Sequence, residues 1–207
     1  SSMPLWSAFL ARNRAPTRVN TAQNAIGFVA THLFTLSVVP AHDLGMNSNA
    51  SSRRWSPSVT VAAIAEREGR FLMVEEHTAE GLRLNNPAGH LESGESLVEA
   101  CAREAMEETG HVFTPRSLLG VYMSRFQRST GEDVTYLRFA FCGEVGSRLA
   151  DAKLDKEIVR ALWLTPEDIR SRQADHRSPL VARCLDDFLR GQRLDLGALH
   201  TDPSIWL

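Results

Sequence analysis

The sequence has 207 residues, of which 43% are hydrophobic and 23% charged, and its formal net charge at pH 7 is −2. A chain of this length builds one sizeable hydrophobic core, so one domain with a short appendage is expected. The balanced charge gives no basic field to hold a nucleic-acid backbone, so a nucleic-acid polymer is not an expected partner. The cysteines Cys101, Cys142 and Cys184 are odd in number and lie in apolar runs, which indicates buried free thiols and a cytoplasmic protein.

Residues 1–55 differ in composition from the rest of the chain. Early arginines precede the first acidic residue, Asp43, and the segment ends in a Ser/Asn-rich stretch typical of a linker. Three interpretations are open: a cleaved signal or transit peptide, an extension that docks on the domain or on a partner, and a weakly ordered leader before a functional start near Met46. The apolar run 25–39 is too short to span a bilayer, so no membrane association is expected. Residues 56–207 are expected to form the domain.

Five segments of that domain are predicted to be β-strands. Apolar runs rich in β-branched and aromatic residues predict strands at residues 58–65, 70–76, 118–125, 134–145 and 158–164. The first two flank a short polar turn and should form a hairpin. Residues 77–89 are expected to form a loop, in which Pro87 restricts the backbone and Gly89 frees it for a sharp turn.

Two helices are expected after the last strand. Thr165 and Pro166 are placed as the N-cap and first residue of a short helix. Ser178 and Pro179 open a longer helix that runs to about Arg190 in the same way. Strands flanked by helices on both sides imply a layered α/β/α sandwich.

A further helix lies between the early and late strands. Ser96 and Glu99 form a capping box, so this helix should begin near Leu97. Gly110 is placed to end it. At about 100° per residue, its apolar side chains form one stripe that packs on the body of the protein. The stripe consists of Leu97, Val98, Cys101, Ala102 and Ala105.

Three acidic residues crowd the end of this helix. Glu104 lies three residues before Glu107 and four before Glu108, and such like-charge pairs cost about 0.2–0.5 kcal/mol each. The helix macrodipole adds an unfavourable contribution of about 0.3–1 kcal/mol at this end. Glu108 also lies at the edge of the apolar stripe, where an unpaired carboxylate is costly to bury. A carboxylate cluster suits a hard cation, so Mg²⁺, or alternatively Mn²⁺, is the expected cofactor.

The same stretch carries a recognisable pattern of spacing. The residues at its fixed positions are Gly89, Glu95, Arg103, Glu104, Glu107, Glu108 and Gly110. This pattern resembles the Nudix box of the Nudix hydrolases. Ala105 and His111 depart from it, because they occupy positions where the box has larger aliphatic residues.

The resemblance covers residues 56–207 and implies a fold and an activity. The implied fold is the Nudix-type α/β/α sandwich, with a mixed sheet and a loop-helix-loop Nudix box. Nudix hydrolases cut diphosphate linkages in nucleoside diphosphate derivatives. The stretches NNPAGHLE, YLRFAF and LWLTPEDI are similar to phosphatases of the family that act on nucleoside di- and triphosphates and on hydroxymethylpyrimidine diphosphate.

The resemblance also implies roles for particular residues. Glu104, Glu107 and Glu108, with a carbonyl at Gly89, would hold the metal. Either Glu104 or a downstream acid would be the general base, and Glu157 is a candidate for that role or for an extra ligand. Arg103 is expected to pair with Glu95 or Glu107 and to orient the helix and its preceding loop.

Substrate-binding candidates lie outside the box. They are Arg125, Arg128, Arg138, Glu76 and Tyr122. The first two follow a strand end and could bind phosphate, and Arg138 lies in an apolar strand, where an ion pair is the alternative. Glu76 ends a strand near the box loop, and Tyr122 could stack on a base.

Two classes of function remain open from the sequence. One is a hydrolase of a small phosphorylated metabolite, whose alternative specificities include ADP-ribose and oxidised nucleotides. The other is a non-catalytic nucleotide-binding module of the same fold. The intact acidic set favours the hydrolase, because a binding module need not keep costly like charges together. Monomer and homodimer are both compatible with the motifs.

Overall fold

The computed structural model describes residues 54–128 and 130–207, so the interpretations of residues 1–55 lie almost entirely outside it. The strands of this part are β1 (Ser58–Arg67), β2 (Arg70–Thr78), β3 (Gly81–Asn85), β4 (Ala88–His90), β5 (His111–Gln127), β6 (Asp133–Arg148) and β7 (Ile158–Leu164). The α-helices are α1 (Leu97–Thr109), α2 (Pro166–Ser171) and α3 (Leu180–Leu189). Short 3₁₀ helices follow at η1 (Gln173–Asp175), η2 (Leu196–Ala198) and η3 (Pro203–Trp206).

The strands form one mixed sheet around β1. Its main order is β3-β2-β1-β6-β5, with β4 paired to β1 and β7 paired to β2. The predicted hairpin is confirmed, since β1 and β2 are antiparallel and Glu66 lies opposite Phe71. The pairing of β1 with β6 is parallel, whereas β5 and β6 are antiparallel. The sheet is therefore mixed, as expected.

The prediction of a loop over residues 77–89 is wrong, because two short strands lie there. β3 pairs with the end of β2, and its Leu84 is fully buried in the core. The three residues of β4 pair with β1 and place Gly89 opposite Val61. Segments this short, bounded by Asn and Pro, carry too little periodicity to be distinguished from a loop.

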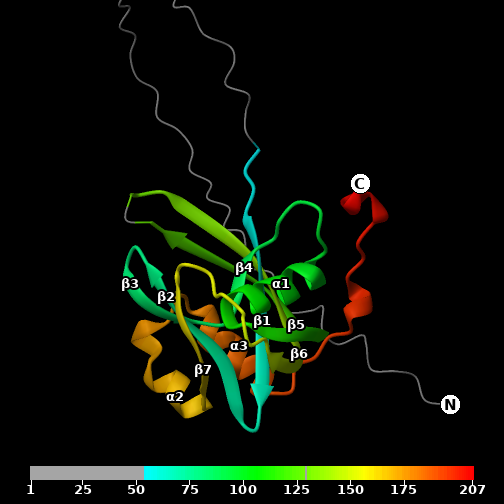
Figure 1. Ribbon diagram of the computed structural model, residues 1–207. Helices are drawn as coiled ribbons and strands as arrows, with labels where there is room; N and C mark the ends of the chain where they lie inside the picture. The colour runs from blue at the N-terminus through cyan, green and yellow to red at the C-terminus, as the bar shows by residue number, and fades with distance from the viewer. Residues whose placement is uncertain (1–53, 129) are drawn as a thin grey trace, which may run out of the picture. The chain divides into compact units, whose positions relative to one another are not determined.

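Two hydrophobic clusters cover the two faces of the sheet. Figure 1 shows the helices and strands that contribute residues to them. Ala62 and Ile64 of β1 pack in the cluster that contains residues of α2 and α3. Val61 and Ala63 point to the other cluster, which contains Leu97, Val98, Cys101 and Ala105 of the predicted stripe of α1. Ala102 is not part of this cluster, and the fully buried Ala100 belongs to it instead. Alternate residues of β1 are thus buried on opposite faces. The α/β/α layering predicted from the sequence is confirmed.

The predicted helix boundaries hold closely. Ser96 Oγ accepts from Glu99 N at 3.2 Å, and Glu99 Oε2 accepts from Ser96 N at 2.8 Å, which completes the capping box. Gly110 ends α1 with φ +71°, a left-handed conformation that glycine adopts without strain. In α3 the first helical residue is Leu180, one position later than expected.

Two further expectations concern the state of the cysteines and the length of the helices. Cys101, Cys142 and Cys184 are all free and buried. Each helix in the described residues is too short or too polar to cross a membrane.

Candidate active site

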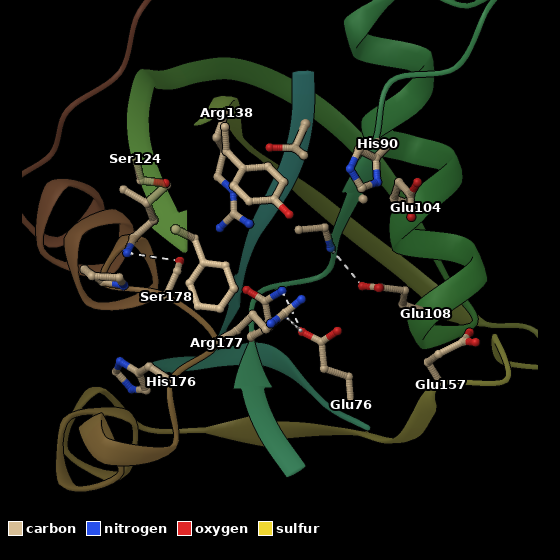
Figure 2. A pocket seen from close by; sticks show the side chains of 18 of the residues that line it. Glu76, His90, Glu104, Glu108, Ser124, Arg138, Glu157, His176, Arg177 and Ser178 are labelled. Carbon is tan, nitrogen blue, oxygen red and sulfur yellow. Dashed lines mark hydrogen bonds and ion pairs between the residues drawn. The ribbon is translucent and has the colours of Figure 1, made fainter. Parts of the chain in front are cut away.

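A cavity of about 740 Å³ opens between the box helix, the sheet and the segment before α3. Its lining includes Glu76, Gly89, Glu104, Glu108, Arg138 and Glu157 among the residues expected to act (Figure 2). The volume is within the range typical of small-molecule sites, about 300–1,000 Å³. Acidic side chains gather at its α1 wall, and arginines and amides line the opposite part.

Gly89 and Glu104 lie in direct contact at the α1 wall. A Cβ added at Gly89 would be 2.1 Å from Glu104 Cδ and Oε1, closer than any real contact. β4 and α1 therefore approach closely only because position 89 has no side chain. The glycine in the box fixes where the Glu104 carboxylate lies.

Glu108 is buried beside the same wall, with 7% of its surface exposed. Its Oε2 accepts a hydrogen bond from Ala88 N at 2.8 Å. Loss of hydration on burial raises the pKa of Glu108 to about 9, and the nearby charges of Glu76, Glu104 and Asp155 add to the shift. Burial also raises the pKa of Glu104. Two carboxyl groups that resist ionisation thus face one cavity.

Arg103 ties the box loop to the helix. Its Nε and Nη2 donate to the two carboxylate oxygens of Glu95 at 2.9 and 2.8 Å. Nη1 donates to Glu104 and to Glu107, both at 2.8 Å, and Nη2 also reaches the carbonyl of His90 at 3.0 Å. The pairing expected with Glu95 or Glu107 is present with both.

Glu107 lies differently from the other two box glutamates. Its side chain is 41% exposed, is held by Arg103 and is not among those that line the cavity. Over residues 54–128 and 130–207, no three His, Cys, Asp or Glu side chains form a group that could hold a metal ion. The expected trio is therefore divided, with Glu104 and Glu108 at the cavity and Glu107 on the outer side of Arg103.

The residues at the α1 wall fit a hard divalent ion in their chemistry. Glu104 and Glu108 offer carboxylate oxygens, and the backbone at Gly89 is close enough to touch the Glu104 carboxylate. Oxygen donors of this kind suit Mg²⁺ or Mn²⁺. The raised pKa values of both carboxyl groups indicate a position where a cation would be strongly stabilising.

Glu157 lines the cavity, and so does Asp155, which the sequence did not single out as a site residue. The backbone N of Asp155 donates to Glu107 O at 3.0 Å, which fixes this loop against the end of α1. Burial raises the pKa of Asp155, and the charges of Glu107 and Glu157 add to the shift. Glu157 was predicted from the sequence, and its closeness in the chain to Asp155 was a signal that could have identified the second residue.

The substrate-binding candidates divide between the cavity and the surface. Arg125 lines the cavity, although its side chain is 69% exposed and paired with Asp133. Arg138 is buried in the wall, with 8% of its surface exposed. Glu76 also lines it and accepts from Asn85 Nδ2 at 3.0 Å.

Two candidates are not brought to the cavity, which corrects their expected placement. Arg128 pairs with Glu132 in the exposed turn between β5 and β6, at 3.1 Å. Tyr122 packs against the core on the α3 side and donates its hydroxyl to the buried Asp187 at 3.0 Å. Its ring packs against the core and is not available to a ligand, because that position of β5 faces α3.

Several cavity residues gave no sequence signal of their own. Thr60, Asn85, His176 and Arg177 come from β1, β3 and the segment that follows η1. The backbone N of Arg177 donates to Leu84 O at 2.9 Å, and this hydrogen bond holds Arg177 beside a strand that is distant from it in the sequence. Only the folded chain shows that these segments meet.

Comparisons with known proteins agree with this geometry. A model of the NUDIX domain matches residues 54–184. The Phosphatase NudJ proteins of Escherichia coli K12 and Shigella boydii are each 39% identical over 143 residues, which is 69% of this chain and 90% of theirs. A solved NUDIX hydrolase from Nitrosomonas europaea is 48% identical, with a TM-score of 0.67 over 71% of this chain and 98% of that one.

The fold, the box helix and these relatives define a hydrolase that acts on acid anhydrides in phosphorus-containing compounds. The chain belongs to the Nudix family, and the resemblance in its sequence to the NudJ phosphatases is confirmed.

Proposed function

We propose that the chain is a Mg²⁺-dependent phosphatase of nucleoside di- and triphosphates, or of a related small diphosphate such as hydroxymethylpyrimidine diphosphate. The observation that carries the proposal is the placement of Glu104 and Glu108 on one wall of a substrate-sized cavity, both with raised pKa values. The relatives named phosphatases, at 39% identity, support the phosphatase specificity. The substrate is a small phosphorylated metabolite, since the volume of the cavity, about 740 Å³, is typical of small-molecule sites.

Glu104, Glu108 and the backbone carbonyl at Gly89 are the groups that would hold Mg²⁺, or Mn²⁺ in its place. When bound there, the metal would neutralise phosphate charge and lower the pKa of a water molecule. Glu107 would act from the outer side, through the Arg103 guanidinium that it shares with Glu104. Arg103 would thus orient the Glu104 carboxylate and would not itself react.

The remaining chemistry falls to residues on the other sides of the cavity. Glu157 lines the cavity and is a candidate to accept the proton of the attacking water or to serve as an extra ligand. Arg125 at the rim would bind a substrate phosphate by exchanging its exposed ion pair with Asp133. Positioning and charge neutralisation are what phosphoryl transfer mainly requires.

A phosphate-release assay tests the proposal. ATP, ADP, hydroxymethylpyrimidine diphosphate and ADP-ribose are each incubated with the full chain and Mg²⁺, with EDTA as the metal-free control, and the products are identified. Release of orthophosphate that depends on the metal is the expected result. Nucleotide binding without release of phosphate would instead favour a binding module, and release of a nucleoside monophosphate from ADP-ribose would favour the other specificity.

The cell compartment follows from the thiols. Cys101, Cys142 and Cys184 are free, and a protein with buried unpaired thiols suits a reducing environment. A cytoplasmic location is therefore proposed.

A further inference from the structure

Arg138 is a buried cation whose hydrogen bonds are incomplete. It lies on β6, lines the cavity and has 8% of its surface exposed, yet its Nε and Nη1 have no partner in the described residues. Burial lowers the pKa of Arg138, because the charged guanidinium is less stable here than in water. An unsatisfied buried donor costs about 1–3 kcal/mol, and more if it is charged. A ligand that accepts hydrogen bonds would remove this cost.

The helix α3 begins at the same side of the cavity. Residues 178–180 and Ala182 line the cavity, and Figure 2 shows Ser178 on the side of Arg138, across from Glu108. No side chain caps α3 at its first position, Pro179. Within the part of the chain that the structure describes, no group accepts a hydrogen bond from Ala182 N. A helix N-terminus carries about half a positive charge together with free N–H groups, so it favours an anion.

The strands beside Arg138 bring the sheet and α3 together. Thr60 of β1 lies opposite Arg138, and its Oγ1 is buried without a partner in the described residues. Tyr122 of β5 lies opposite Arg138 on the other side of β6 and donates to Asp187 of α3. A hydroxyl group can donate as well as accept. A guanidinium and a hydroxyl from the sheet therefore face the same part of the cavity as the start of α3.

The other polar side chains in this part of the cavity are largely paired with one another. Glu76 accepts from Asn85 Nδ2 at 3.0 Å and lies 3.7 Å from Arg177 Nε, so its charge is balanced. Asn85 Oδ1 is unpaired, but it belongs to the amide that already holds Glu76. His176 Nε2 lies 2.9 Å from the carbonyl oxygen of Ile169, and this contact makes Nε2 the donor. The buried Nδ1 accepts in that form and donates once the ring gains a proton.

A phosphoryl group matches the donors that remain. Its tetrahedral oxygens can accept from Arg138 and Thr60 on the sheet and from the N–H groups of α3 at the same time. At the α1 wall, by contrast, the charges of Glu104 and Glu108 repel a phosphate when no cation lies between them. The cavity thus offers two environments for phosphate, one that calls for a metal and one built from donors alone.

We propose that Arg138, Thr60 and the N-terminus of α3 form a metal-independent site for a phosphoryl group of the substrate other than the one held at the α1 wall. The preferred substrate is then a diphosphate with a further phosphoryl group, either next along the same chain or as a separate monoester. Such a compound binds more tightly than a simple nucleoside diphosphate. This inference rests on the proposed function only for the phosphate at the α1 wall.

Inorganic phosphate tests the site directly. In calorimetry with the full chain at pH 7, low salt and EDTA, wild type should bind phosphate, and Arg138→Met should bind it about 10- to 100-fold more weakly. Arg116→Met removes an arginine that pairs with Glu144 outside the cavity, so it should leave the affinity unchanged. Absence of binding to wild type, or equal affinity of Arg138→Met and wild type, would overturn the proposal. A loss in Arg125→Met in place of Arg138→Met would move the anion to the rim and overturn it too.

A pair of variants at Ala182 tests the contribution of α3 while Arg138 stays intact. Ala182→Asp adds a carboxylate to the first turn, where a negative charge stabilises a helix but would repel a bound phosphate. Ala182→Asn has nearly the same shape without the charge. The aspartate variant should bind phosphate about 10-fold or more weakly than the asparagine variant, with no loss of Tm. Equal affinity of the two would show that the start of α3 does not contact the anion. This pair decides the question even if Arg138→Met fails to fold.

Three adenine nucleotides distinguish the sources of the phosphoryl group. ADP is the reference, ATP extends the chain, and adenosine 3′-phosphate 5′-diphosphate adds a separate monoester. In EDTA, wild type should bind at least one of the last two about 10-fold more tightly than ADP, and the gain should disappear in Arg138→Met. Each compound that shows the gain identifies a source. Absence of an Arg138-dependent gain with both compounds would overturn the assignment of the site to the substrate.

The outcomes separate this inference from the proposed function. Arg138-dependent binding of phosphate in EDTA, without release of phosphate in Mg²⁺, would leave the anion site standing and remove the phosphatase. Metal-dependent release of phosphate from ADP, with equal phosphate affinity in wild type and Arg138→Met, would do the reverse.

Discussion

The carboxylate of Glu104 lies in the space where a side chain at Gly89 would begin, with its Cδ 2.1 Å from the position of the missing Cβ. β4 and α1 are therefore in closest contact at the point where the acidic residues face the cavity. The box loop and the box helix act as one unit, because Arg103 joins the loop residue Glu95 to the helix residues Glu104 and Glu107. The positions of these carboxylates follow from packing as well as from charge.

Gly89→Ala should displace the Glu104 carboxylate while the fold survives. The obstructing atoms are the far end of a flexible side chain, so the helix itself need not move. We expect phosphate release to fall about 100-fold or more, since small misplacement of a reacting group has effects of this size. Circular dichroism should be unchanged and Tm only slightly lower.

Gly94→Ala is the control for this substitution. Its φ of +87° makes an alanine strained, but nothing lies within 4 Å of its Cβ. It should lower Tm without a comparable loss of phosphate release. Equal activity of Gly89→Ala and wild type would show that the contact with Glu104 does not matter for turnover.

The box glutamates should differ from one another in their effect on activity. Glu104→Gln and Glu108→Gln each replace a carboxyl group that would hold the metal with a neutral amide, and should lower kcat about 10²–10³-fold, the size expected for losing one electrostatic stabiliser. Glu107 is outside the cavity lining and bonded to Arg103, so Glu107→Gln should cost about 10-fold or less. Steady-state kinetics at saturating Mg²⁺ gives the comparison, and an equal loss in all three would place Glu107 among the metal ligands.

Much of the fold was predictable from local pattern. The capping box at Ser96 and the glycine end at Gly110 are local features that appear in the structure as expected. The apolar stripe of α1 is also present, except that Ala100 and not Ala102 is buried in it. The strands with long apolar runs were also found, but β5 begins at His111, seven residues before the predicted start at residue 118. β3 and β4 were missed, because their stability comes from pairing with β2 and β1 and not from their own sequence.

The candidate site was most predictable on its box side, although Glu76, Arg125, Arg138 and Glu157 outside the box were also predicted and line the cavity. The acids of α1 stand out because their spacing and their place at the helix end are unfavourable without a partner. The opposite side also depends on Thr60, Asn85 and Arg177, which were not predicted because distant segments bring them together. Tyr122 was expected to stack on a base because it is aromatic, but in the structure its hydroxyl donates to Asp187.

Arg103→Lys should weaken the contacts between the box loop and α1 but leave the residues that line the cavity unchanged. Lysine keeps the charge but cannot bind both oxygens of Glu95 while also reaching Glu104 and Glu107. We expect kcat to fall about 10- to 100-fold and Tm to fall by a few degrees. Arg116→Lys, at an ion pair with both side chains more than half exposed, is the control and should change neither quantity.

The buried carboxylate of Glu75 should give the protein a component of stability that disappears in acid. Glu75 is 3% exposed and accepts hydrogen bonds from Arg160 Nε at 2.6 Å and from Arg172 Nη2 at 2.7 Å. The bond from Arg160 is the largest cause that lowers its pKa below the ordinary 4.5, against the opposing effect of burial. A carboxyl group with a lowered pKa stabilises the folded state above pH 4.5, and this contribution is lost as the pH falls through the folded-state pKa.

Glu75→Gln should therefore lower the free energy of unfolding at pH 7 by about 1–3 kcal/mol, because both arginines lose a charged partner. The difference from wild type should shrink progressively as the pH is lowered below 4.5, where the wild-type carboxylate also becomes protonated. Urea unfolding at pH 7, 5 and 3 measures both quantities. Glu144→Gln removes an ion pair whose side chains are 61% and 70% exposed, so it should change stability by less than about 1 kcal/mol at every pH. A difference between Glu75→Gln and wild type that stays constant from pH 7 to 3 would mean that the carboxylate charge is not what stabilises this contact.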